Sequence, residues 1–165
     1  MKLDLLNELR RESTWRLFFL CLITLFVYPA HYIARQTKVI NGHVDESEQI
    51  EAGFVWTIFA VSYLSMGLFI GYFFVEEDHP VAVASNISDR IQTFLFLFWA
   101  FAARKRINSA TKAYKGSTEW FHGFWTFFFT YLYLNFKINS LTKADAGPAE
   151  GDTLRTSDTS FERHS

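Results

Sequence analysis

The side chains of this chain that could do chemistry are few and widely spaced. His31 and His122 both lie in apolar segments, and two membrane histidines can ligate a haem iron axially. Each can equally be the polar tip of an interfacial ring, because Tyr32 and Trp120 lie nearby. The sequence has no glycine-rich phosphate loop, paired-carboxylate site, nucleophile constellation or metal-ligand spacing. We expect no catalytic residue, no cofactor and no metal site, with a bis-histidine haem protein as an alternative.

Asp89 and Arg90 form the one charged pair that could fall inside a bilayer. Ionisable groups at that depth indicate ion or proton pathways. Ser88, however, is a suitable N-cap for a helix over 89–103, with Asp89 in its first turn. The sequence favours this capped start outside the hydrocarbon core. A helix that starts earlier, near Val81, would place the pair inside it.

Gly67 and Gly71 form a pair of small residues four apart in an apolar helix, a spacing that lets two backbones approach closely. They predict helix packing, either against another helix of this chain or against a second copy.

One concentrated basic patch follows the third apolar segment. Its side chains can contact anionic lipid headgroups or the acidic face of a partner, or only fix the orientation of the chain in the membrane. The patch consists of Arg104, Lys105, Arg106, Lys112 and Lys115.

These residues are positioned by apolar segments, of which 53–75 is the longest. It contains no Asp, Glu, Lys or Arg over its 23 positions (75 − 53 + 1). As a helix it would be about 34 Å long, enough to cross a hydrocarbon core of about 30 Å. It predicts a transmembrane helix.

The remaining segments are shorter or interrupted. Segment 15–34 is interrupted by Pro29, which bends or ends a helix, so it either spans with a kink or enters and turns back. Segment 89–103 is short for a span, and 120–136 is dominated by aromatic residues. Residues 1–14 predict an amphipathic helix on the membrane surface, and 142–165 a disordered polar tail. The fold class is therefore all-α: a small polytopic membrane protein with two to four membrane helices in a domain over 15–141.

The distribution of Lys and Arg discriminates between topologies, because short cytoplasmic loops carry an excess of them. Of 16 such residues, Arg155 and Arg163 lie in the tail, and four plain spans would divide the remaining 14 equally. If the first and last segments turn back instead, Arg90 alone lies outside. Similar exits at 38–41, 106–108 and 137–139 agree with this. We favour two spans and two hairpins, with both termini cytoplasmic, over four spans.

Several short blocks resemble a bacterial family of small membrane proteins, domain of unknown function 4234. The resemblance covers about 15–141 and departs from the family pattern at Phe26, where glycine is usual, and at Pro29. It implies a protein of the bacterial inner membrane with no known activity. The matching blocks are Ile23-Thr24-Leu25-Phe26-Val27-Tyr28, then Tyr32, Arg35 and Asn41; Phe98-Trp99-Ala100 with Arg104, Arg106 and Asn108; and Tyr131-Leu132-Tyr133-Leu134 with Lys137-Ile138-Asn139.

Composition narrows the function classes further. The net charge of −1 does not favour nucleic acid as a partner, and the single Cys21 excludes an intramolecular disulfide. We expect a non-catalytic integral membrane protein, in contact with anionic lipid and with a membrane protein partner or a second copy, that scaffolds or modulates a membrane complex. A small transporter or channel subunit is the alternative.

Overall fold

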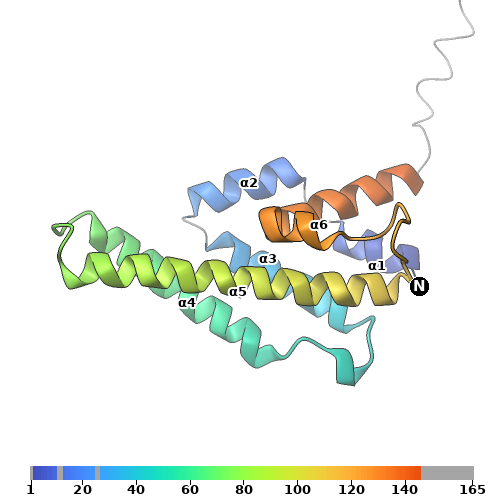
Figure 1. Ribbon diagram of the computed structural model, residues 1–165, viewed down its shortest axis with the longest axis horizontal. Helices are drawn as coiled ribbons and strands as arrows, with labels where there is room; N and C mark the ends of the chain where they lie inside the picture. The colour runs from blue at the N-terminus through green and yellow to red at the C-terminus, as the bar shows by residue number, and fades with distance from the viewer. Residues whose placement is uncertain (1, 11–12, 25–26, 146–165) are drawn as a thin grey trace, which may run out of the picture.

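The computed structural model describes residues 2–10, 13–24 and 27–145, and all regular structure in them is helical (Figure 1). The all-α fold class is therefore confirmed. The elements are α1 (Lys2–Leu9), α2 (Thr14–Ile23), α3 (Tyr28–Asn41), the single 3-10 turn η1 (Glu46–Glu48), α4 (Ala52–Tyr72), α5 (Pro80–Ala110) and α6 (Gly123–Asp145).

Helices α4 and α5 form a long antiparallel hairpin. Their 21 and 31 residues give lengths of about 31 Å and 46 Å. A hydrogen bond between the hydroxyl oxygens of Ser65 and Ser88, 2.6 Å apart, fixes the register on one side of the hairpin. Near the other end of α5, the Arg106 guanidinium donates to the carbonyl oxygen of Glu48.

The start predicted for α5 is wrong. The helix begins at Pro80, whose missing N–H and fixed φ suit the first helical turn. His79 caps it, because its Nδ1 accepts a hydrogen bond from the Val81 amide at 3.2 Å. Ser88 therefore lies inside the helix, and Asp89 and Arg90 follow it there.

Segment 15–34 turns back on itself. Thr24 closes α2 and accepts a hydrogen bond from the Tyr28 amide on its hydroxyl at 3.0 Å, and Pro29 lies in the first turn of α3. Contacts with α6 show the reversal. The amide of Asn135 donates to Thr14 at the start of α2, and Asn135 also accepts from the Tyr32 hydroxyl on α3.

The aromatic segment 120–136 also reverses. Within α6, Thr130 has φ 43° and ψ −125°, which are not helical values. The two parts of α6 fold together, so the Phe121 and Tyr133 rings meet edge to face at 6.3 Å and the Tyr133 hydroxyl accepts from the His122 amide. Two of the apolar segments thus reverse direction, and their return to the cytoplasmic side of a membrane stays a prediction.

The first helix does not present its leucines to a membrane surface. Leu5, Leu6 and Leu9 are each at most 1% exposed, because α1 packs against α3 and α6. The helix is amphipathic as predicted. Protein, rather than lipid, covers its apolar face, and a location at the membrane surface stays a prediction.

The main core lies where α3 and α6 pack on the second half of α5, with α1 and α2 packed in turn on α3 and α6. Its largest fully buried side chains include Trp99, Tyr32 and Phe121. The Trp99 indole N–H donates to the Thr37 hydroxyl at 2.8 Å, which satisfies a buried donor.

Figure 1 shows that the turn at 73–79 lies alone at one end of the molecule, whereas residues 42–51 and 111–122 lie at the other end, with the start of α1.

One helix of the described chain, α4, is long and apolar enough to cross a membrane, and only 17% of its most apolar window is buried. Helix α5 does not meet the same criteria of length and apolar composition, so the number of spans stays a prediction.

Helix α6 continues to Asp145, into the segment where the sequence predicts a disordered tail. The rest of that tail, 146–165, lies outside the described residues.

Candidate functional site

The seam between α4 and α5 is polar along the first half of α5. Ser85, Ser88 and Gln92 recur every three or four residues on α5, and Ser62 and Ser65 face them from α4; all five are buried. The Gln92 amide donates to the Ser62 hydroxyl at 3.1 Å, and Ser65 bonds Ser88. These hydrogen bonds tie the two helices together without large apolar side chains between them.

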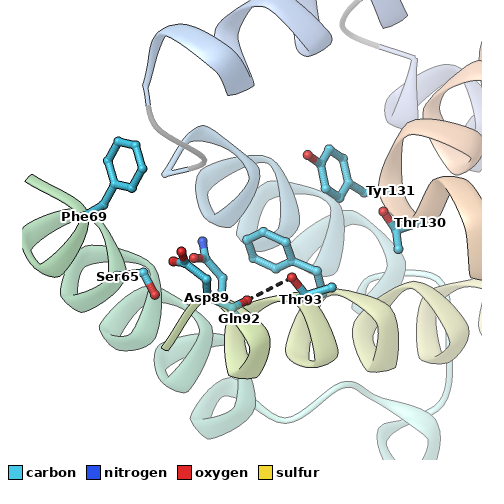
Figure 2. Close-up of a pocket in the computed structure, with 8 residues that line it drawn as sticks. Ser65, Phe69, Asp89, Gln92, Thr93, Thr130 and Tyr131 are labelled. Atoms are coloured by element: carbon cyan, nitrogen blue, oxygen red, sulfur yellow. Dashed lines mark hydrogen bonds between the residues drawn. The ribbon is translucent and has the colours of Figure 1, made fainter. Parts of the chain in front are cut away.

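A pocket of about 340 Å³ opens beside this seam (Figure 2). Helices α4, α5 and α6 contribute to it, and the bend in α6 forms one wall. Its lining combines hydroxyl, amide and carboxylate groups with three aromatic rings: Ser65, Phe69, Asp89, Gln92, Thr93, Phe96, Thr130 and Tyr131.

Asp89 is the one ionisable carboxyl group in this lining. Its side chain is exposed, and its backbone carbonyl oxygen accepts from the Thr93 hydroxyl at 2.9 Å, the bond that is dashed in Figure 2. Phe96 and Tyr131 close the pocket towards the core, their rings edge to face at 5.8 Å. A carboxylate, an amide and hydroxyls beside aromatic rings could hold a proton or a small cation.

The two glycines predicted to pack helices differ. A Cβ added to Gly71 would lie 3.2 Å from Cγ1 of Val81, so α4 and α5 approach closely there. A Cβ added to Gly67 would meet nothing within 4 Å. Gly71 therefore packs within this chain, and Gly67 is left open on the surface of α4.

The basic patch also contains some residues that contact this chain and others that are exposed. Two of its members bind backbone carbonyl groups: Arg104 donates to Phe121 at 3.2 Å, and Arg106 to Glu48 and Gln49. These two hold the connections 111–122 and 42–51 against α5. Lys105, Lys112 and Lys115 are exposed, so contact with anionic lipid or a partner stays a prediction for these three.

The two histidines contact different helices. His31 lies 3.1 Å from the Tyr63 hydroxyl on α4, and its ring packs on Phe59 at 4.9 Å. His122 is exposed beside Tyr133 of α6. The contacts of the two residues lie on different helices, so the geometry favours their interpretation as polar ring tips.

Sequence reasoning missed Gln92 and Thr93 as members of the site. The signal was present, because Ser85, Ser88 and Gln92 follow one helical face once α5 starts at Pro80. The assumed start at Ser88 concealed this spacing.

No family model, curated protein or solved structure matches this chain. The family resemblance therefore stays a prediction.

Proposed function

We propose that this chain is a non-catalytic integral membrane protein of a bacterial inner membrane whose α4–α5 hairpin crosses the bilayer. One observation carries the proposal: α4 is inverted relative to a water-soluble helix. Its buried residues are Ile58, Ser62 and Ser65, whereas Trp56 and Leu64 are 72% and 57% exposed. A helix in water buries its apolar face, but a helix in lipid gains nothing by doing so.

Exposed apolar side chains are also found on other helices. Large apolar side chains are exposed on α2, α5 and α6, among them Phe19, Ile23, Phe94, Phe98, Phe127 and Phe128. Contiguous apolar surface on this scale marks a membrane or protein interaction site. The proposed topology leaves 73–79 alone on the far side, with both termini and the connections 42–51 and 111–122 in the cytoplasm.

Lipid and a partner share this surface in the proposal. The first part of α6 exposes three aromatic side chains close together in the chain, Phe124, Phe127 and Phe128. We place the partner of a scaffolding or modulating role there. Purification in mild detergent from cells that express the parent or a triple serine variant at these positions, followed by mass spectrometry, tests for a partner that depends on this face.

The membrane assignment is tested by Leu64→Arg in the middle of α4. In lipid, exchanging Leu for Arg at a helix centre costs roughly 3–4 kcal/mol of insertion free energy, so we expect the variant to leave the membrane fraction or be degraded. Phe74→Arg, beyond the end of α4, is the control and should remain inserted, since Phe74 is 83% exposed near the far-side turn. A Leu64→Arg chain that is monodisperse and helical in water without detergent would overturn the proposal.

The polar pocket favours a second candidate, a small transporter or channel subunit. In the proposed hairpin Asp89 lies nine residues (89 − 80) after Pro80, about 14 Å along α5 and thus near mid-bilayer. Proton or cation flux into liposomes that contain the parent, and its loss with Asp89→Asn but not with Asp78→Asn in the turn, would support this function. Equal flux in all three preparations would reject it.

A further inference from the structure

A second surface lies away from the polar pocket, between α2 and the C-terminal part of α6. Two hollows there share three lining residues, Thr14, Trp15 and Phe136, and are therefore continuous. One is polar and basic, and the other is almost wholly apolar. Neither includes a member of the basic patch at Arg104–Lys115.

The polar hollow, about 570 Å³, lies between the start of α2 and the last turns of α6. Arg10 and Lys143 are exposed at its rim, and hydroxyl and amide groups line it between them. Arg and Lys beside such groups are the usual partners of a phosphate. Its polar members are Arg10, Ser13, Thr14, Asn139, Ser140 and Lys143.

The apolar hollow, about 630 Å³, continues from it towards the bend of α6. Helix α2 forms one side and the two parts of α6 form the other. From Lys143 to Leu132 the surface follows 11 residues (143 − 132) of helix, about 16 Å, which is close to half of a hydrocarbon core of about 30 Å. Its lining includes Trp15, Phe18, Trp125, Phe129, Leu132 and Phe136.

The floor between the two hollows is held rigidly. The side-chain amides of Asn135 and Asn139 donate to the Thr14 hydroxyl at 3.3 Å and 3.5 Å, which fixes α2 against α6. Cys21, deeper along α2, accepts from the Tyr131 hydroxyl at 3.5 Å. The groove is therefore formed by the fold before any ligand enters, which lowers the entropic cost of binding.

We propose that this groove binds one anionic phospholipid, with its phosphate between Arg10 and Lys143 and an acyl chain along Trp15 and Phe136. Charge complementarity selects the headgroup, and the apolar hollow matches one leaflet in depth. The basic end lies at the cytoplasmic side of the proposed topology, where anionic lipids attract basic groups. The inference rests on the proposed membrane location, but lipid binding in detergent is measured independently of topology.

The test is native mass spectrometry of the detergent-purified full chain with phosphatidylglycerol or phosphatidylcholine of identical acyl chains. Each base near an anionic headgroup changes affinity about fivefold. Arg10→Gln with Lys143→Gln should therefore weaken phosphatidylglycerol binding about 30-fold. Phosphatidylcholine binding should weaken much less, because its choline cation offsets the charge of the phosphate. Lys38→Gln removes an exposed charge from α3, outside both hollows, and should have no effect on the bound lipid.

The apolar half of the groove is tested by comparing two tryptophan variants, one inside the groove and one outside it. Trp15 and Trp56 are both 72% exposed, but only Trp15 lines the groove. Trp15→Ala should weaken both lipids at least fivefold, whereas Trp56→Ala should change neither. Circular dichroism of each variant confirms that the fold is retained.

Three results would overturn the proposal. The first is equal affinity of the parent for the two lipids. The second is an unchanged preference in the Arg10/Lys143 variant. The third is displacement of phosphatidylglycerol by an equal concentration of glycerophosphate, which would identify a site for a free anion rather than for a lipid. A chain that fails the Leu64→Arg test would contradict the membrane assignment without deciding any of these three.

Discussion

The buried face of α5 is polar in its first half and apolar in its second. In the hairpin half, which we define as 80–93 with the facing part of α4, the buried residues are Ala82, Ser85, Ser88 and Gln92. In the core half, 94–110, they include Trp99, Ala103 and Ile107. Protein surrounds the core half on several sides, whereas the hairpin half has α4 as its main neighbour.

The two halves of α5 are therefore stabilised by different interactions. In the core half, burial of large side chains supplies the free energy, as in a soluble domain. In the hairpin half, apolar side chains point outward and the two helices are joined by hydroxyl and amide hydrogen bonds. Such bonds contribute modestly in lipid, about 1 kcal/mol each, so the hairpin half should depend on its surroundings more than the core half does.

The largest effect is expected in the core half, from Trp99→Ala. This change removes a side chain that is 1% exposed and leaves the Thr37 hydroxyl without its donor. We expect a loss of about 3–5 kcal/mol in the free energy of unfolding, measured by unfolding in mixed detergent micelles and circular dichroism. Trp56→Ala on the exposed face of α4 should cost less than about 0.5 kcal/mol. Equal losses would mean that burial of Trp99 does not stabilise the core half.

The next effect concerns close approach within the hairpin half. Gly71→Leu forces a side chain against Val81, and such overpacking costs about 1–3 kcal/mol. Gly67→Leu meets open space and should leave the unfolding free energy within about 0.5 kcal/mol of the parent. Native gels of the two variants separate the roles: a change in migration with Gly67→Leu alone would support self-association through α4. If both variants keep the stability and migration of the parent, neither glycine packs a helix.

A smaller effect is expected from the polar seam. Ser65→Ala leaves the buried Ser88 hydroxyl without its partner, at a cost of about 1 kcal/mol in lipid. In a double-mutant cycle, adding Ser88→Ala should cost less than the sum of the two single changes. Strict additivity would show that the serine pair does not join the helices.

A substitution at the bend of α6 should raise the free energy of unfolding, whereas the three preceding substitutions lower it. At φ 43° and ψ −125°, Thr130 occupies a region typical of glycine, and a β-branched residue is strained there. Thr130→Gly should therefore raise the unfolding free energy, by about 1 kcal/mol. Thr93→Gly, in regular helix, should lower it by a few tenths. A loss of stability with Thr130→Gly would contradict the strained bend.

The sequence predicts the long helix α4 and the reversal of two apolar segments because charge absence, proline position and the distribution of bases are local or additive signals. It fails where a residue has two compatible roles. Ser88 suits an N-cap, and only its pairing with Ser65 across 23 residues shows that it lies inside α5. Leu5, Leu6 and Leu9 suit a membrane surface as well as a core, and the choice depends on the distant α3 and α6.

The site was the least predictable part. Asp89 was singled out, but the pocket beside it depends on the bend at Thr130, and no local signal in Phe-Phe-Phe-Thr-Tyr marks such a bend. The groove between α2 and α6 likewise joins Arg10 to Lys143, which lie more than a hundred residues apart.

In the proposed topology the α4–α5 hairpin crosses the membrane while the other two hairpins return to the cytoplasmic side. The most direct measurement labels single cysteines with a membrane-impermeant maleimide in intact cells and in inverted vesicles, in a Cys21→Ala background. We expect Glu77→Cys to be labelled only from outside, and Gly42→Cys, Lys112→Cys and Lys143→Cys only from the cytoplasmic side. Labelling of Gly42→Cys and Lys112→Cys from outside, with Glu77→Cys labelled only in inverted vesicles, would contradict the proposed topology and establish four plain spans.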